Sequence, residues 1–115
     1  MLIPYERPMF ICEKPVDFRM GIDALSRVIT EVLCGNLLDG SVYAFHNAAS
    51  DRMKLLFWDG NGFTMIYKRL VGCRFKLKKM FKAVEKISYE DMDLLLSAGE
   101  PMIVSRLPAL LEHQA

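Results

Sequence analysis

The chain has 115 residues, 52% of them hydrophobic and 25% charged, and its formal net charge at pH 7 is +1. These values are typical of one folded domain, and they exclude a disordered chain. No apolar run reaches the roughly 18 residues that cross a bilayer, and the N-terminus lacks a secretory pattern. Three cysteines without CxxC spacing favour free thiols. We therefore expect a cytoplasmic protein without membrane contact.

The first third of the chain predicts a strand and then a helix. Residues 8–16 form a short apolar strand, which Pro15 restricts to a sheet edge or to a strand end. Asp17 can cap a helix that begins near Phe18 or Arg19. Apolar residues recur after it at helical spacing, namely Ile22, Leu25, Val28, Ile29, Val32 and Leu33. The pair Gly35-Asn36 is a natural end for this helix.

The middle of the chain predicts three strands. Residues 41–46 alternate as one strand, and residues 51–69 read as a β-hairpin. Its turn, Asp59-Gly60-Asn61-Gly62, contains the residues that tolerate positive φ angles. The period of two on both arms predicts that one set of side chains faces a core.

The last third combines a basic segment with a helix. Residues 68–86 hold eight Lys or Arg against one Glu, a net charge of +7 on a chain that otherwise carries −6. Ser88 and Asp91 resemble a capping box for a helix that buries Met92, Leu95 and Leu96 and ends near Gly99. The order β-α-β-β-β-(basic loop)-α predicts an α+β fold, with a small, mainly antiparallel sheet, a central hairpin and two helices. We predict one domain over residues 1–99 and a C-terminal tail over 100–115. In the tail we expect an apolar patch at 102–104 and one helical turn after Pro108.

Catalytic and metal-binding patterns are weak. His46 and His113 have no nucleophile partner pattern, and the cysteines and histidines have no zinc spacing. Asp17, Asp23, Asp51 and Asp59 could hold metal ions, as in nucleases, but each also has an ordinary structural role. We therefore expect no enzyme activity, no metal and no cofactor.

Basic and aromatic residues provide the candidate binding sites. A basic segment on an otherwise acidic domain can contact phosphates, although it can also be a solvated loop. Trp58 can pack on the sheet or contact a partner. The predicted nucleic-acid contacts are Arg52, Lys54, Lys68, Arg69, Arg74, Lys76, Lys78, Lys79 and Lys82, and the predicted partner contacts are Trp58 and Tyr67.

Three segments resemble the TnpB accessory protein, the small second-ORF protein of the insertion sequence 66 family of bacterial transposable elements. They are VDFRMGIDALSRVI (16–29), DRMKLLFWDGNGFTMIYKRL (51–70) and CRF (73–75). The matching positions are Asp17, Arg19, Gly21, Asp23, Asp51, Arg52, Lys54, Trp58, Asp59, Gly60, Gly62, Tyr67, Lys68, Arg69, Arg74 and Phe75. Cys73 and Leu77 depart from the family pattern, which has Gly and Trp there, and so do the lysine-rich stretch and the tail.

The resemblance implies a non-catalytic role in transposition beside a larger transposase that carries the catalytic acids. Two hypotheses follow. In the first, the basic residues contact the DNA of element ends or of the target. In the second, the protein is an adaptor that binds the transposase through the aromatic hairpin and does not touch DNA. A small metal-dependent nuclease is a weaker third reading.

Overall fold

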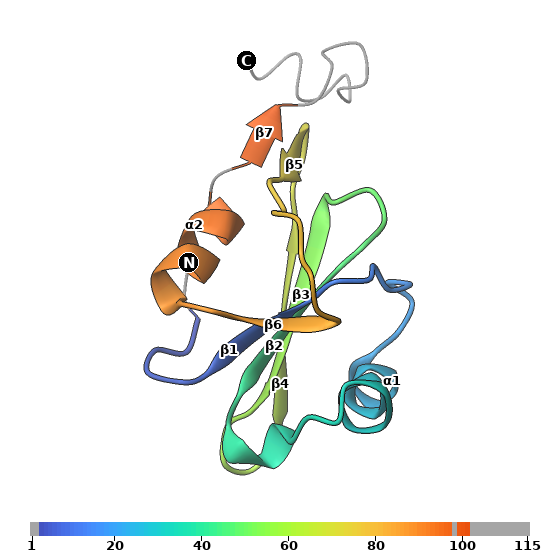
Figure 1. Ribbon diagram of the computed structural model, residues 1–115, viewed down its shortest axis with the longest axis vertical. Coiled ribbons are helices and arrows are strands. Elements are labelled where there is room, and N and C mark those ends of the chain that lie inside the picture. The colour runs from blue at the N-terminus through green and yellow to red at the C-terminus, as the bar shows by residue number, and fades with distance from the viewer. Residues whose placement is uncertain (1–2, 98, 102–115) are drawn as a thin grey trace.

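The computed structural model describes residues 3–97 and 99–101 (Figure 1). Its elements are β1 (Met9–Cys12), α1 (Ile22–Arg27), the π-helix η1 (Val28–Val32), the 3-10 helix η2 (Leu37–Asp39), β2 (Val42–His46), β3 (Arg52–Trp58), β4 (Phe63–Arg69), β5 (Cys73–Phe75), β6 (Val84–Ile87), α2 (Tyr89–Ser97) and β7 (Gly99–Pro101). The predicted α+β class, with a mainly antiparallel sheet and two helices, is confirmed.

The main sheet has five strands in the order β4-β3-β2-β1-β6. Only the β1–β2 pair is parallel, and the helical segment between these strands makes the crossover that a parallel pair needs. β5 and β7 form a separate two-stranded ladder. The two edges of the main sheet are therefore β4, from the hairpin, and β6, from the basic segment.

The predicted hairpin is confirmed as β3 and β4, paired from Arg52↔Arg69 to Trp58↔Phe63. In the turn, the Asp59 carboxylate accepts hydrogen bonds from the backbone N–H groups of Asn61 and Gly62, at 3.3 and 3.2 Å. Gly60 has a φ of 110°, a conformation that glycine adopts without steric cost. The local sequence thus fixes both the turn and the register.

One set of side chains on β3, Met53, Leu55 and Phe57, faces a core as predicted, and the second face of β3 is covered as well. Its five central residues are all buried, because β3 lies inside the sheet and packed clusters cover both faces. β4, at the edge, has no buried residue. Alternation predicts a half-buried strand, whereas the position of a strand in the sheet decides whether its second face is also covered.

The first helix begins later than predicted, at Ile22 with Gly21 at its N-cap. Asp17 does not cap it, because its carboxylate accepts a hydrogen bond from the backbone N–H of Arg19 and holds a separate turn. The helix continues as a π-helix, and a side chain on Gly35 would collide with the ring of Tyr43 and with Ile29. The helical segment ends at Val32, three residues before the predicted stop at Gly35.

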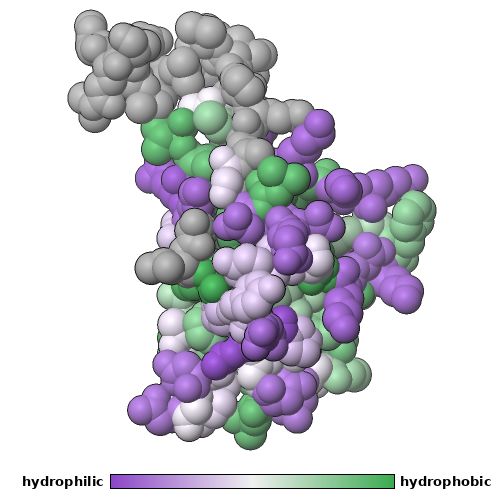
Figure 2. Space-filling model, turned by 90° about the vertical axis from the view of Figure 1, so that its left-hand side faces the viewer, coloured by the Kyte–Doolittle hydropathy of each residue, from purple (hydrophilic) through white to green (hydrophobic). Residues whose placement is uncertain are grey.

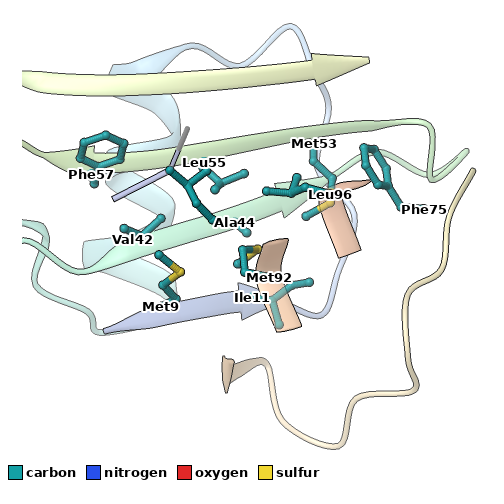
Figure 3. Close-up of a cluster of buried hydrophobic side chains, with 11 residues drawn as sticks. Met9, Ile11, Val42, Ala44, Met53, Leu55, Phe57, Phe75, Met92 and Leu96 are labelled. Carbon is teal, nitrogen blue, oxygen red and sulfur yellow. The ribbon is translucent and has the colours of Figure 1, made fainter. Parts of the chain in front are cut away.

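The second helix, Tyr89–Ser97, agrees with the prediction. The Ser88 hydroxyl accepts a hydrogen bond from the Asp91 backbone N–H at 3.1 Å, as an N-cap should. Met92 and Leu96 are fully buried, and Leu95 packs against the same cluster. Figure 3 shows this helix placing Met92 and Leu96 against side chains from the strands. That cluster fills the α2 side of the sheet, while α1 and η1 pack on the other side.

The basic segment is not one loop, because it contains β5 and β6. β6 pairs with β1 from Met9↔Ile87 to Cys12↔Val84, so β1 is an interior strand and ends before Pro15. A four-residue strand with Glu85 and Lys86 at its centre has too weak an apolar pattern to stand out within a lysine run. β7 begins at residue 99 and continues past the predicted end of the domain. The division into a domain and a C-terminal tail stays a prediction. The apolar patch at 102–104 and the turn after Pro108 lie outside the described residues.

No helix within residues 3–97 is long and apolar enough to cross a membrane.

Candidate nucleic-acid interface

Backbone hydrogen bonds join the open end of the hairpin to β5. The Asp51 carbonyl accepts from the Leu70 N–H, and the Ser50 carbonyl accepts from the Phe75 N–H, both at 2.7 Å. These bonds bring together three arginines, each next in sequence to a bonded residue: Arg52, Arg69 and Arg74. We call these three residues the arginine group.

Two members of the arginine group stand directly opposite each other. Arg52 and Arg69 are cross-strand partners at the end of the β3–β4 ladder. Like charges in this arrangement destabilise a sheet. Arg52 is half-buried, and its Nε is the one buried side-chain nitrogen or oxygen without a hydrogen-bond partner among the described residues. Arg69 and Arg74 are exposed. The arginine group therefore has excess positive charge and an unused donor, the features that an oxyanion offsets.

Lys54 has a structural position. Its side chain is only 4% exposed, and its ammonium group donates to the carbonyls of Phe18 and Met20, at 2.9 and 2.8 Å. The same nitrogen lies 4.9 Å from the ring centre of Phe18 and 5.4 Å from that of Tyr67. Burial lowers the pKa of Lys54, and Asp17 opposes part of this shift. Because its charge is used inside the fold, Lys54 is removed from the predicted nucleic-acid contacts.

Lys68 also binds backbone within the protein. Its ammonium group donates to the Leu96 carbonyl in the last turn of α2, at 2.6 Å. A cation at the C-terminus of a helix satisfies a free carbonyl and offsets the negative end of the helix dipole. Lys68 thus fastens the hairpin to α2, although it was predicted as a nucleic-acid contact.

The aromatic residues of the hairpin differ in exposure. Trp58 is half-buried and packs edge-to-face on Phe63, with ring centres 5.0 Å apart. The Trp58 carbonyl accepts a hydrogen bond from Arg7 at 2.8 Å. Tyr67 is 45% exposed and packs edge-to-face on Phe18. Trp58 therefore packs on the sheet, whereas part of the Tyr67 side chain is exposed to solvent.

The predicted lysine contacts after β5 lie on the stretch that leads to β6. Lys78, Lys79 and Lys82 are exposed, and the Lys79 ammonium lies 5.7 Å from the ring centre of Phe81. Lys76 is also exposed and takes part in an interaction within the protein. Figure 2 looks onto one side of the molecule and shows hydrophilic side chains projecting along its right-hand edge, with hydrophobic surface between them.

Three of the four carboxylates that suggested a nuclease are in local contacts, and the fourth, Asp23, is exposed in the first turn of α1. Asp17 makes an exposed ion pair with Arg19 at 2.6 Å, and these hydrogen bonds hold the pKa of Asp17 at about 2. Asp51 accepts a hydrogen bond from the Asn47 side chain at 2.6 Å. Hydrogen bonds, the first from the Thr64 hydroxyl, lower the pKa of Asp59. Among the described residues, no group of three or more His, Cys, Asp or Glu side chains could hold a metal ion.

His46 has a structural position. His46 is 6% exposed, and its Nε2 lies 2.9 Å from the Glu13 carbonyl. The three cysteines are free thiols, and burial raises the pKa of Cys12 to about 12. His46, Cys12 and Cys34 are not next to the arginine group in sequence, whereas Cys73 directly precedes Arg74.

Comparison with known proteins agrees with the sequence resemblance. The profile of IS66 Orf2-like proteins matches residues 7–103. The chain belongs to this family. It is 26% identical over 100 residues to protein y4jC of Sinorhizobium fredii (strain NBRC 101917 / NGR234), a match that covers 87% of this chain and 86% of y4jC. It is 30% identical to protein y4hO of the same strain over 89 residues, 77% of each chain. No solved structure matches this chain significantly.

Membership of the IS66 Orf2-like family makes the chain an accessory protein of an insertion sequence. Within this family member, the sequence motif DRMK…YKR combines two kinds of residue. Lys54 and Lys68 bind carbonyls, whereas Arg52 and Arg69 oppose each other, and the Arg52 Nε has no partner within the described part of the chain. Sequence reasoning missed this division, although counting back from the turn pairs residue 52 with residue 69. It also missed Arg7 and Phe18, for which only the folded contacts give a role.

Proposed function

We propose that this IS66 Orf2-like protein acts without catalysis, together with a separate, larger transposase, and contacts the phosphates of element or target DNA. The arginine group makes the first of these contacts. Arginine suits this task, because its planar guanidinium donates two parallel hydrogen bonds to a phosphate.

The observation that carries this proposal is the opposed pair at the open end of the hairpin. Arg52 and Arg69 repel each other in the free protein, and the buried Nε of Arg52 has no acceptor among the described residues. A phosphate bound by the outer nitrogens of the two guanidinium groups offsets the repulsion. An arrangement that costs stability in the free protein but favours an anion is typical of a binding site.

The lysine-rich stretch extends this contact along the chain. Arg74 lies on β5, and Lys76, Lys78, Lys79 and Lys82 follow it within eight residues. Exposed lysines bind phosphates as point charges, without sequence preference. Lys54 and Lys68 are left out of the interface, because their ammonium groups bind carbonyls.

The second candidate is an adaptor that binds the transposase through the hairpin without touching DNA. Its support is the exposure of Phe63 (38%) and Tyr67 (45%) on the edge strand β4. Trp58 supports it less, because that side chain packs on Phe63 and is half-buried. An adaptor of this kind has no affinity for DNA of its own.

The decisive experiment measures the affinity of the full chain for a duplex oligonucleotide, by fluorescence anisotropy, at several salt concentrations. Arg69→Gln with Arg74→Gln should reduce the slope of log K against log salt by about 2, one unit for each lost phosphate contact. Arg19→Gln with Arg27→Gln is the matched control. It removes two exposed positive charges outside the arginine group and should leave the slope nearly unchanged.

A separate variant, Arg52→Gln, distinguishes a binding role from a structural one. Removing one of two opposed charges should leave the protein as stable or more stable, while the affinity for DNA falls. A structural arginine would give the reverse, a less stable protein with unchanged affinity. Equal salt slopes for the parent and both double variants would reject the arginine group as a DNA contact. A parent protein without affinity for DNA would favour the adaptor function.

A further inference from the structure

The strand β6 is a free edge of the main sheet. It pairs with β1 on one side, and among residues 3–97 and 99–101 no strand lies on its other side. An edge strand has backbone N–H and C=O groups that can pair with another strand. Covered edges are the rule in stable proteins, so the surroundings of β6 indicate what it can accept.

Two hollows flank this edge, one on each face of the sheet. The hollow on the α2 side has a volume of about 410 Å³, and that on the opposite side about 440 Å³. Side chains of β6 alternate between them. Glu85 and Ile87 lie opposite Ile11 and Met9, which belong to the cluster on the α2 side, whereas Val84 and Lys86 belong to the other face. A strand added beside β6 would therefore place alternate side chains in the two hollows.

The hollow on the α2 side has both apolar and charged lining residues. Leu77, Met80, Leu94 and Leu95 line it together with Ile87, and Leu94 is 63% exposed. Four lysines and two carboxylates complete the lining, which gives a positive balance. Such a surface suits an apolar side chain whose neighbours are acidic.

The hollow on the opposite face has fewer lining residues, and it is also basic. It is lined by Phe10, Lys82, Val84, Glu85 and Lys86. Two ammonium groups beside one carboxylate favour an acidic side chain there. The hollow on the α2 side therefore has more apolar lining residues, and the opposite hollow combines Lys82 and Lys86 with Phe10 and Val84.

We infer that the free edge of β6 binds an extended segment of a partner protein, in which apolar and acidic residues alternate. The backbone of this segment pairs with β6, its apolar side chains enter the hollow beside α2, and its acidic side chains meet Lys82 and Lys86. This is recognition by strand addition, in which main-chain hydrogen bonds give affinity and alternate pockets give specificity. DNA phosphates can meet the exposed lysine side chains around these hollows, but duplex DNA has neither a strand to pair with β6 nor an apolar side chain for the hollow beside α2. The inference goes beyond the DNA contact proposed above and does not depend on it.

A second copy of the chain fits this edge poorly. In a symmetric antiparallel pair of β6 strands, opposite residues must lie on the same face of the joined sheet. The centre of the pair would then place Glu85 opposite Glu85, or Lys86 opposite Lys86, and either arrangement is unfavourable. The lysine-rich stretches before the two strands would add further repulsion. An acidic segment of another protein has neither problem.

The test uses a fluorescent peptide of about six residues, the length of a typical strand, in which glutamate and valine alternate. Its affinity for the full chain is measured by anisotropy at fixed salt. Three control peptides have lysine in place of glutamate, glutamate throughout, or methylated backbone amides. We expect the alternating acidic peptide to bind, and each control to bind at least about tenfold more weakly. The controls lack, in turn, the acidic side chains, the apolar side chains and the backbone N–H donors.

Two variants examine the edge itself. Leu94→Asp should weaken binding of the acidic peptide about tenfold, since it places a carboxylate in the hollow beside α2. Lys86→Glu should weaken binding by a similar factor, because it replaces an attractive charge with a repulsive one. Leu94 is already exposed, so its variant should fold, which circular dichroism verifies. Leu38→Asp and Arg27→Glu are the matched controls, an exposed leucine (65%) and an exposed basic residue that line neither hollow, and both should bind as the parent does.

Several results would overturn the inference. Equal binding of the all-glutamate peptide would mean that only charge is recognised, and equal binding by Leu94→Asp or Lys86→Glu would locate the peptide elsewhere. A dimer in light scattering that the acidic peptide does not displace, and that Lys86→Glu disrupts, would assign the edge to a second copy. Duplex DNA binding that is lost in Leu94→Asp would assign the hollow to nucleic acid. The arginine double variant should bind the peptide as the parent does, so this test and the DNA test fail independently.

Discussion

Two basic regions of this protein use their lysines in opposite ways. In the hairpin, the ammonium groups of Lys54 and Lys68 donate to three backbone carbonyls, and Lys54 is buried. On the stretch before β6, Lys78 and Lys82 are exposed and line the two hollows at the sheet edge. A count of charges along the sequence treats all four lysines alike. Their neighbours in the fold decide which of them can meet a partner.

For Lys54, the position of its strand in the sheet explains the difference, whereas Lys68 lies on the edge strand β4 and binds inward because the last turn of α2 is within reach. β3 is an interior strand with packed clusters on both faces, so a lysine on it must find acceptors or lose the solvation of its charge. β6 is an edge strand, and the lysines near it reach solvent without such a cost. We therefore expect substitutions in the first region to change mainly stability, and substitutions in the second to change mainly binding.

The largest expected effect is that of Lys54→Ala on stability. The substitution leaves the Phe18 and Met20 carbonyls without their donor and removes the cation between two aromatic rings. The free energy of unfolding should fall by about 3 kcal/mol. Denaturation by urea, followed by circular dichroism, measures this change. Lys14→Ala, at an exposed position, should change it by less than about 0.5 kcal/mol. If the two variants are equally stable, Lys54 does not anchor the turn at residues 17–20.

A smaller effect is expected for Lys68→Met, which keeps the apolar stem and removes the donor to the Leu96 carbonyl. Loss of this contact at the end of α2 should cost about 1 kcal/mol, or about 4 °C in Tm. The salt slope of DNA binding should stay that of the parent. A large loss of slope with unchanged Tm would place Lys68 at the DNA interface, and the contrast between the two regions would then fail.

Much of the fold was predictable because its signals are local. The residues at 59–62 specify a tight turn, and the apolar spacing after Ile22 specifies a helix. β6 was not predictable in this way, since a four-residue strand has almost no pattern of its own and forms by pairing with β1, more than seventy residues away. The same holds for the second buried face of β3, which depends on what packs over it.

The candidate site was predictable in part for the same reason. The hairpin register follows from the turn, so the opposition of Arg52 and Arg69 could be read from sequence. The burial of Lys54 could not, because a lysine in an alternating strand normally faces solvent. The hollows at β6 combine residues from β1, α2 and the lysine-rich stretch, and only the folded chain brings these together.

The smallest expected effect concerns the exposed ion pair between Asp17 and Arg19, on the turn that Lys54 anchors. Hydrogen bonds from Arg19 hold the pKa of Asp17 at about 2, and Arg19→Ala should return it toward 3.8, as an NMR titration of the carboxyl can measure. Because the folded pKa is the lower one, the pair contributes stability above pH 3.8, and the contribution is lost as the pH falls through about 2. Both side chains are exposed, so Arg19→Ala should move the urea midpoint at pH 7 far less than Lys54→Ala does. A comparable loss in the two variants would mean that the turn is held by its own ion pair, and that burial of Lys54 adds little.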